Sequence, residues 1–583
     1  MNEFCAKMYF EQALKAHQSG EVATAKKLYL LELNRASANA HDALFNLGHI
    51  EMQSSNFILA ADYFSKAIAI NSKDAATFTN AGICYSLVGD LELAKKYLSA
   101  SLELDSTNVQ ATMHLAVTLS RLGLVDEAVA QLEKAILIYP NNTDLLINAA
   151  LALTEVGRHK EALKYFEKTI QNAPNDAVAL SHYSTTLMEL GQYDESIIQS
   201  EKAISLNPNF SLAYLAKALT LHKLQDFDNA LHNYKLALQL DSNLQVAQIN
   251  IAAIAISKVE DENDFLFALK EAEKSFKFIS NQSNVASSKM IEELPFFRLK
   301  HDFEQALFLN SKGIYSCETS KFLDVISMFI DEHKTHQGQQ LITLTGEAVK
   351  VFSDWRKYPY IYQTPDIKAT LNPKLDWHTI QEKYLSSTPE LIYIDDFLSN
   401  EALKAFQDFS MYSKVWNKEY KGSYLGAFAN QGFISPLHLK LALDLKRAMP
   451  KVFKEYPIGQ LWGFKYDAQL GSGINVHADF AKVNLNFWIT PTESNLDATS
   501  GGLRVYKVPA PNSWTFQDYN RNAEQIYEFL DKNNSSSVTV PYRGNRAVLF
   551  NSALFHETDA IKFKQGYENR RVNMTYLFGS QLA

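Results

Sequence analysis

The N-terminal part of this chain repeats with a period of 34 residues, and this period constrains the fold more than any other feature. Gly48 and Gly82 lie one period apart. Small residues recur at this interval or its multiples in two further series, Ala60, Ala94, Ala128 and Ala162, and Ala67, Ala135, Ala203 and Ala237. Units end at Pro140, Pro174 and Pro208. Small residues let paired helices approach closely and proline stops a helix, so the period predicts stacked helical hairpins.

This repeat resembles the tetratricopeptide repeat, a helix-turn-helix unit of the same length. Residues 1–244 are predicted to form an all-α superhelix of seven repeats. The repeats begin near Ala6, His41, Ala75, Val109, Thr143, Ala177 and Ser211. Residues 245–289 are expected to form capping helices and a linker, because Asn281–Lys289 is rich in Ser and Asn.

Position six of each repeat carries a row of polar side chains. The row, followed into the capping segment, reads Asn46, Asn80, His114, Asn148, His182, Ala216 and Asn250. In tetratricopeptide superhelices this position faces the concave groove, and the row resembles the asparagine ladder of the protein O-GlcNAc transferases. An amide can both donate to and accept from a peptide backbone, so the row predicts a groove for an extended polypeptide. The alternative is that Asn is merely tolerated on a solvated surface.

A different kind of signal lies near the other end of the chain, where His477 and Asp479 are followed by His556 and Arg571. Two imidazoles and one carboxylate can occupy one face of an Fe(II) octahedron and leave the remaining positions open. His477 and Asp479 are two residues apart, so on a strand both side chains would point to one face. His556 would then have to be brought in as the third ligand by the tertiary fold.

The segments around these residues predict short β-strands rather than helices. Aromatic or β-branched runs separated by Gly, Asn and Ser are typical of a sandwich or barrel. The runs are Gln460–Asp467, Val476–Thr490, Gly501–Tyr506, Val538–Tyr542, Arg546–Phe550 and Arg571–Phe578. In the second run, Asn484, Asn486 and Trp488 share one face, and Leu485, Phe487 and Ile489 share the other. We expect the amide face to line a pocket and the apolar face to pack against helices, although the amides could instead serve only in packing.

From Leu391 to Gly579 the chain resembles the Fe(II)/2-oxoglutarate-dependent dioxygenases, in the prolyl-hydroxylase-like branch. The resemblance rests on the LIYIDDFLSNEAL segment, which looks like the first strand and helix of that branch, on the H-x-D motif, on SGGLRVY from Ser500, and on RVNMTYLFG from Arg571. It implies a double-stranded β-helix, or jelly roll, over residues 389–583. It also implies that His477, Asp479 and His556 bind Fe(II) and that Tyr466 touches 2-oxoglutarate.

The same resemblance places an arginine of the last core strand on the distal carboxylate of 2-oxoglutarate. The planar guanidinium suits a carboxylate, and Asn573 would add an amide donor on the same strand face as Arg571. Asn486 is a further candidate for co-substrate binding. Arg570 would point the opposite way, and a register slip of one residue would exchange the two arginines. The resemblance implies oxidative decarboxylation of 2-oxoglutarate by O₂ coupled to hydroxylation, and it admits ascorbate as an accessory reductant.

Two other segments carry weaker signals. Val508–Ser537 is a long insertion with a helix-like stretch at Asn522–Lys532, which could close over a substrate or cover a barrel edge. Residues 290–388 are expected to form a connector, helical at first and irregular around Tyr358–Trp377. Within it, His301-Asp302 is predicted to be a pair on a helix surface and not a second metal site.

Composition excludes several classes of function. The formal net charge is −9 and no Lys/Arg-rich stripe is present, which argues against nucleic acid as the partner. The three cysteines Cys5, Cys84 and Cys317 are too far apart for a thiolate zinc site or a disulfide framework. The first 20 residues are charged throughout and no apolar run is long enough to span a bilayer. The chain is therefore expected to be cytoplasmic and not associated with a membrane.

These features together predict an iron-dependent dioxygenase that uses 2-oxoglutarate, with a protein or peptide substrate recruited by the repeats. Two alternatives remain open. The enzyme could hydroxylate a small molecule or a glycan while the repeats serve assembly. The chain could also be a non-catalytic repeat scaffold with a degenerate oxygenase barrel.

Overall fold

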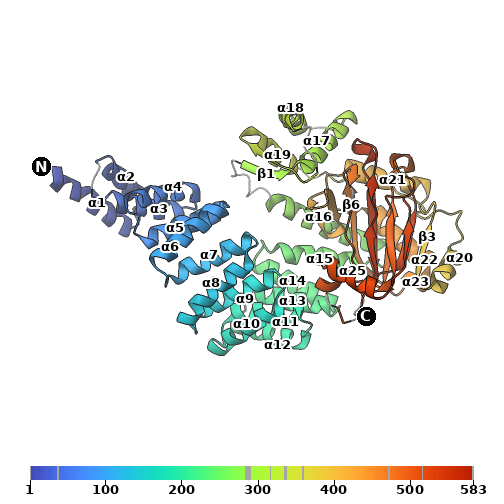
Figure 1. Cartoon of the computed structure of the whole chain (residues 1–583), viewed down its shortest axis with the longest axis horizontal. Coiled ribbons are helices and arrows are strands. Elements are labelled where there is room, and N and C mark those ends of the chain that lie inside the picture. Colours follow the sequence, from blue (N-terminus) through green and yellow to red (C-terminus); the bar gives the residue numbers. More distant parts are fainter. Residues whose placement is uncertain are drawn as a thin grey trace. The chain divides into compact units, whose positions relative to one another are not determined.

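The structure is a computed structural model that describes residues 2–35, 38–282, 291–314, 317–333, 338–357, 360–470, 473–511, 513–514, 516–520 and 522–580. The chain divides into two compact units, Met1–Leu240 and Asp241–Ala583. The first unit is entirely helical and the second contains the β-sheets (Figure 1). Among the described residues, no helix is both long enough and apolar enough to cross a lipid bilayer.

The N-terminal unit is a row of helical hairpins. The first helices of the hairpins are α1 (Asn2–Gln18), α3 (Ala40–Gln53), α5 (Ala75–Val88), α7 (Val109–Arg121), α9 (Thr143–Glu155), α11 (Ala177–Glu189) and α13 (Ser211–Lys223). The second helices are α2 (Val22–Leu33), α4 (Phe57–Ile70), α6 (Leu91–Leu104), α8 (Val125–Ile138), α10 (His159–Asn172), α12 (Tyr193–Leu206) and α14 (Phe227–Leu240). The last five predicted starts are confirmed to the residue. α3 begins one residue earlier than predicted, and α1 begins at Asn2 instead of near Ala6.

Close packing explains why small residues recur in this unit. A Cβ added at Gly82 would lie 2.5 Å from Cγ of Leu98 in the partner helix, and one added at Gly48 would lie 2.6 Å from the Phe64 ring. The alanines of the first series have no exposed surface. Four of the first helices are preceded by an Asp or Asn whose side chain accepts a hydrogen bond from the backbone of the helix. These N-cap residues are Asp74, Asn108, Asn142 and Asp176, again 34 residues apart.

The C-terminal unit is built around an antiparallel sheet of seven strands in the order β3-β11-β8-β14-β6-β5-β4. These strands are β3 (Leu391–Ile394), β4 (Lys418–Tyr420), β5 (Tyr424–Phe428), β6 (Ile458–Tyr466), β8 (Val483–Trp488), β11 (Ala547–Asn551) and β14 (Val572–Phe578). A smaller sheet has the order β10-β9-β12. It consists of β9 (Leu503–Pro509), β10 (Ser537–Val540) and β12 (Leu554–Thr558). Short strands β7 (Gln469–Leu470) and β13 (Ile561–Lys562) form an additional pair.

Strand alternation gives the large sheet two different faces. Leu485 and Phe487 of β8 belong to an apolar core shared with α21 (Asn400–Tyr412) and α22 (Pro436–Ala448). Trp488 and Val548 belong to a second core, which also contains Val505 of the small sheet. One face is therefore covered by helices and the other by the small sheet, as expected for Leu485 and Phe487. Helix α22 was not predicted.

Residues 245–388 also fold with the C-terminal unit. α15 (Gln245–Ser257) and α16 (Phe265–Gln282) contribute Ala252 and Phe276 to the core on the helical face. The connector contains α17 (Phe296–Ser311), α18 (Cys317–Glu332), α19 (Glu347–Lys357) and α20 (Trp377–Ser386). It also contains an antiparallel pair of strands, β1 (Ile291–Pro295) and β2 (Leu341–Thr345), which was not predicted. Most of the predicted Ser/Asn-rich linker, residues 283–289, lies outside the described residues.

The prediction that His301 and Asp302 form a surface pair is wrong. His301 is 1% exposed and Asp302 is 2% exposed. Asp302 accepts hydrogen bonds from Arg298, one turn earlier in α17, and pairs with the His301 ring. This face of α17 packs against the rest of the unit, where the Arg298 guanidinium also bonds to the carbonyl of Trp416. The charges are compatible with burial because they neutralise one another.

Candidate metal centre

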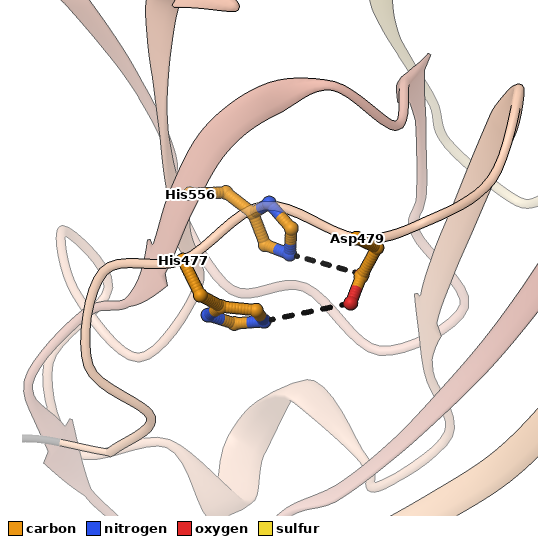
Figure 2. A group of neighbouring side chains, drawn as sticks. All are labelled: His477, Asp479 and His556. Carbon is orange, nitrogen blue, oxygen red and sulfur yellow. Dashed lines mark ion pairs between the residues drawn. The ribbon is translucent and has the colours of Figure 1, made fainter. Parts of the chain in front are cut away.

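His477, Asp479 and His556 meet in the C-terminal unit, between the two sheets (Figure 2). Nε2 of His477 lies 3.9 Å from Oδ1 of Asp479, and Nε2 of His556 lies 3.4 Å from Oδ2. One ligand atom from each of the three residues lies within 4.8 Å of the others. The three side chains that the sequence singled out are therefore close enough to share one ion.

Backbone pairing brings the two histidines together. The amide of His477 donates to the carbonyl of His556 at 3.0 Å, and the amide of His556 donates back at 2.8 Å. The expectation that residues 477–479 form a strand is wrong, because only His477 makes a ladder contact, as an isolated bridge. The amide of Asp479 instead donates to the carbonyl of Ser552. Backbone hydrogen bonds to β12 and to the turn before it therefore position His477 and Asp479. Alternation along a strand, which was expected to position them, does not.

The protonation states suit a divalent cation. Nδ1 of His477 lies 2.8 Å from the carbonyl of Asn475, and Nδ1 of His556 lies 3.0 Å from that of Leu554, so each Nδ1–H can donate and each Nε2 keeps its lone pair. Burial, followed by the neighbouring His556, lowers the pKa of His477 to about 4. Burial acts to raise the pKa of Asp479, but the two neighbouring histidines and the hydrogen bond from Asn484 outweigh it and the pKa is lowered. At neutral pH the His477 ring is therefore neutral and the Asp479 carboxylate is charged.

The donor set also fits the geometry of a metal ion. Metal–ligand bonds of roughly 2.1 Å place adjacent octahedral ligands about 3.0 Å apart. The 3.4 and 3.9 Å separations around Asp479 exceed this by less than 1 Å, which small side-chain rotations can close. Two imidazoles and one carboxylate on one side of an ion are typical of non-haem Fe(II) sites with open positions.

A row of amides continues from the carboxylate into the cavity. Asn484 donates to Oδ2 of Asp479 at 2.7 Å, and Asn486 donates to Oδ1 of Asn484 at 2.6 Å. Asn573 and Thr575 of β14 both donate to Oδ1 of Asn486, at 3.0 and 2.6 Å. The expected polar face of β8 is thus a connected hydrogen-bond network that fixes the Asp479 carboxylate.

Arg571 lies in the same cavity with unmet hydrogen-bonding capacity. Its Nε donates to the carbonyl of Gly501 at 2.7 Å and Nη2 to that of Gly502 at 3.3 Å. Its guanidinium carbon lies 4.7 Å from the centroid of the Tyr466 ring. Nη1 of Arg571, the Tyr466 hydroxyl and Nε1 of Trp462 are all buried without a hydrogen-bond partner among the described residues. Buried donors are normally satisfied, so these three indicate a ligand that accepts hydrogen bonds.

Arg570 points away from this cavity. Its guanidinium pairs with Glu304 of α17 at 2.8 Å and with Asp467 at 3.2 Å. Of the two adjacent arginines, Arg571 is the one that shares a cavity with the candidate metal ligands, and Asn573 lies beside it. Binding of 2-oxoglutarate by Arg571, Asn573, Asn486 and Tyr466 remains a prediction.

The cavity is small, about 30 Å³, which is room for two or three water molecules. A five-carbon dicarboxylate therefore requires the apolar lining to move outward. Besides the predicted residues, the lining contains Trp462, Phe464, Ile474, Leu503, Thr558 and Thr575. These residues were not predicted from the sequence. Thr575 could have been found by extending the alternation of Arg571 and Asn573 along β14.

The long insertion packs behind the candidate ligands. Ala478 and Phe555, each a chain neighbour of a ligand, pack with Ile526 and Leu530 of α25 (Ala523–Lys532). Tyr519 of the short helix α24 (Phe516–Asn520) belongs to the same cluster, and its carbonyl accepts a hydrogen bond from the Ala478 amide. The insertion therefore packs against the small sheet through Tyr506, Val508 and Phe555. That it closes over a substrate, or covers a barrel edge, stays a prediction.

The side chains of the predicted groove row lie in several environments. Asn46, Asn148 and Asn250 each donate to the backbone carbonyl four residues earlier in their own helix. Asn80 is 8% exposed and contacts Nε2 of His49 at 3.2 Å. His114 and His182 are half-buried, and burial lowers the pKa of both rings. A uniform row of accessible amides is therefore absent from this series, and peptide binding remains a prediction.

Comparison with known proteins identifies the helical unit. The tetratricopeptide repeat family matches residues 41–74, 87–152, 143–176, 177–210 and 212–244. The N-terminal unit therefore consists of tetratricopeptide repeats stacked as a helical superhelix. None of the curated proteins matches the chain.

Several solved structures are similar to the chain, and two of them are described as tetratricopeptide repeat proteins. A tetratricopeptide repeat protein from Parabacteroides merdae is 16% identical and covers 42% of this chain and 95% of its own, with a TM-score of 0.38. YrrB, described as a tetratricopeptide protein with an unusual peptide-binding site, is 26% identical and covers 32% and 96%, with a TM-score of 0.26. PilF from Pseudomonas aeruginosa is 19% identical and covers 35% and 93%, with a TM-score of 0.30.

Proposed function

We propose that the C-terminal unit is a jelly-roll dioxygenase that uses Fe(II) and 2-oxoglutarate to hydroxylate a protein or peptide side chain. The observation that carries this proposal is the shared cavity of His477, Asp479, His556 and Arg571. Two antiparallel sheets with a common core support the jelly-roll assignment. A structural ion pair would account for the histidines, but it would not account for the unmet donor on Arg571.

Each residue has a defined role in this proposal. His477 and His556 would bind the iron through Nε2, with their rings oriented by the carbonyls of Asn475 and Leu554. Asn484 would keep the Asp479 carboxylate facing the ion. Iron held there with 2-oxoglutarate would supply O₂ activation coupled to decarboxylation.

The co-substrate would be oriented by its far carboxylate. Nη1 of Arg571 and the Tyr466 hydroxyl would donate to this group, and both atoms now lack partners among the described residues. Burial raises the pKa of the Tyr466 hydroxyl, although the charge of Arg571 opposes the shift, so the phenol keeps its proton and can donate. The apolar lining from Phe464, Ile474 and Leu503 would keep water from the chelated end.

A protein substrate is proposed because tetratricopeptide repeats commonly present extended binding surfaces, which suits recruitment of a polypeptide. The C-terminal site by itself is equally compatible with a small molecule or a glycan. Detection of the oxygenated product distinguishes these substrate classes, and it also distinguishes an enzyme from a scaffold.

The test measures succinate formed by the full chain with Fe(II), 2-oxoglutarate and O₂. We expect slow uncoupled turnover that is lost in Asp479→Ala. Proteins retained by Asp479→Ala are then treated with the wild-type chain and examined by mass spectrometry for a gain of one oxygen. Absence of succinate together with absence of iron binding would leave the scaffold as the function.

A further inference from the structure

A second cavity of about 280 Å³ lies on the opposite side of β6 and β14 from the candidate metal centre. The cavity is lined by Lys465, Arg570 and Val572. Each of these residues is adjacent in the chain to a residue whose side chain points to the opposite side, toward the candidate metal centre. Residues of α21, the loop after β8 and the segment Tyr567–Asn569 complete its walls. Its volume is near the lower end of the range for small-molecule sites.

The most unusual group in this cavity is the buried amine of Lys465. The side chain is 2% exposed, and Nζ donates to the carbonyl of Ser410 and to the hydroxyl oxygen of Tyr567, both at 2.9 Å. The Tyr567 hydroxyl donates its own proton to the carbonyl of Met411. These two bonds satisfy both N–H groups of a neutral amine, whereas the protonated amine has a third N–H group and no third acceptor among the described residues.

Lys465 also has no carboxylate partner within the described part of the chain, whereas neighbouring Arg570 has two. The rings of Trp416 and Tyr567 lie 4.6 and 4.3 Å from Nζ. Burial lowers the pKa of Lys465 well below its usual value, with Arg570 as the next cause. The Trp416 and Tyr567 faces favour the charged form. An anion entering the cavity would supply a charge partner and a third hydrogen-bond acceptor for the protonated amine.

A second unmet group lines the same cavity. Ser410 is 1% exposed, and its hydroxyl has no hydrogen-bond partner among the described residues. The remaining wall includes the apolar side chains of Met411, Ile489 and Val572. A ligand that satisfies this surface needs a hydrogen-bond acceptor with negative charge at one end and an apolar body.

We propose that this cavity binds a small monocarboxylate with a short apolar chain. The carboxylate accepts hydrogen bonds from Lys465 and Ser410, and the chain packs against Met411, Ile489 and Val572. A phosphate fits less well because its second charge would face Glu493 and Glu568, which also line the cavity. This site does not depend on the proposed oxygenase activity, since it uses none of the candidate metal or co-substrate residues.

The test is calorimetric titration of the metal-free full chain with hexanoate, with hexanol as a neutral ligand of matched length. We expect hexanoate to bind and hexanol to bind at least tenfold more weakly. Lys465→Met should lower hexanoate affinity at least tenfold, and Ser410→Ala should lower it severalfold. Ser410→Ala provides a second test that removes a single oxygen, should Lys465→Met fail to fold.

Arg571→Gln is the matched control on the other face of β14, and it should leave hexanoate affinity unchanged. Loss of binding in Arg571→Gln would place the carboxylate in the candidate metal site and overturn the proposal. No hexanoate binding, or equal binding of hexanol, would also overturn it.

Discussion

Replacing Arg571 with Gln tests the co-substrate site most directly. The substitution removes a buried positive charge whose Nη1 faces the cavity without a partner among the described residues. Removing one partner of a buried, hydrogen-bonded charge pair costs roughly 2–5 kcal/mol of binding. A value of about 3 kcal/mol corresponds to a loss of 2-oxoglutarate affinity of about a hundredfold, since each 1.4 kcal/mol is tenfold.

The neighbouring Arg570 supplies a matched control with the opposite expectation. Arg570→Gln leaves Glu304 and Asp467 without their common partner. Breaking a buried ion pair costs about 3–5 kcal/mol of stability. The two carboxylates are partly exposed, so we expect a value at the lower end of that range. Co-substrate affinity of the folded protein should remain close to that of the wild type.

The assay is an anaerobic titration of the Fe(II)-loaded chain with 2-oxoglutarate, followed by the weak visible charge-transfer band of the chelate. Urea unfolding of the same variants measures stability. Wild-type affinity in Arg571→Gln would refute the assignment of the anchor. A loss of affinity in Arg570→Gln alone would show that the strand faces are interchanged.

Three further changes test other parts of the structure. Asn484→Ala removes the hydrogen-bond donor to Asp479. Fe(II) affinity, measured against a competing chelator, should therefore fall about 10- to 100-fold. An unchanged affinity would contradict the role of the amide row. Gly82→Ala would place Cβ 2.5 Å from Leu98 and should lower the free energy of unfolding in urea by about 1–3 kcal/mol, whereas a neutral result would mean that the helices can separate. Burial lowers the pKa of His438 to about 3 in the folded chain. At pH values below the unfolded pKa of about 6.5, the unfolded chain binds more protons than the folded chain, so the free energy of unfolding falls as the pH is lowered. His438→Leu should therefore flatten the decline in stability between pH 6 and pH 4 by up to about 1.4 kcal/mol per pH unit, and an unchanged slope would show that the ring is not held neutral.

The repeat unit could be predicted almost completely because its determinants are local. Gly82 and Ala94 mark positions where two helices of one hairpin touch, and the contacts repeat with the period of the chain. Asp74 and Asn108 cap helices that start at the next residue. Such signals require no knowledge of distant segments.

The candidate site could be predicted only in part. His477 and Asp479 are close in sequence, and the resemblance to a known family pointed to His556 and Arg571. The backbone bridge between His477 and His556 was not predictable, because it joins segments about 80 residues apart. The burial of His301 and Asp302 was also missed, since it depends on how α17 packs against the rest of its unit.

The sequence by itself determined the period of the repeats, the residue types at the candidate metal centre and the polar face of β8. Tertiary structure alone decided which arginine faces the cavity and where the insertion packs. It also decided that Lys465 is buried and that the buried Ser410 hydroxyl has no hydrogen-bond partner among the described residues. The physical reason is that helix packing within a hairpin depends on residues a few turns apart. Whether a buried polar atom finds a partner depends instead on every segment folded around it.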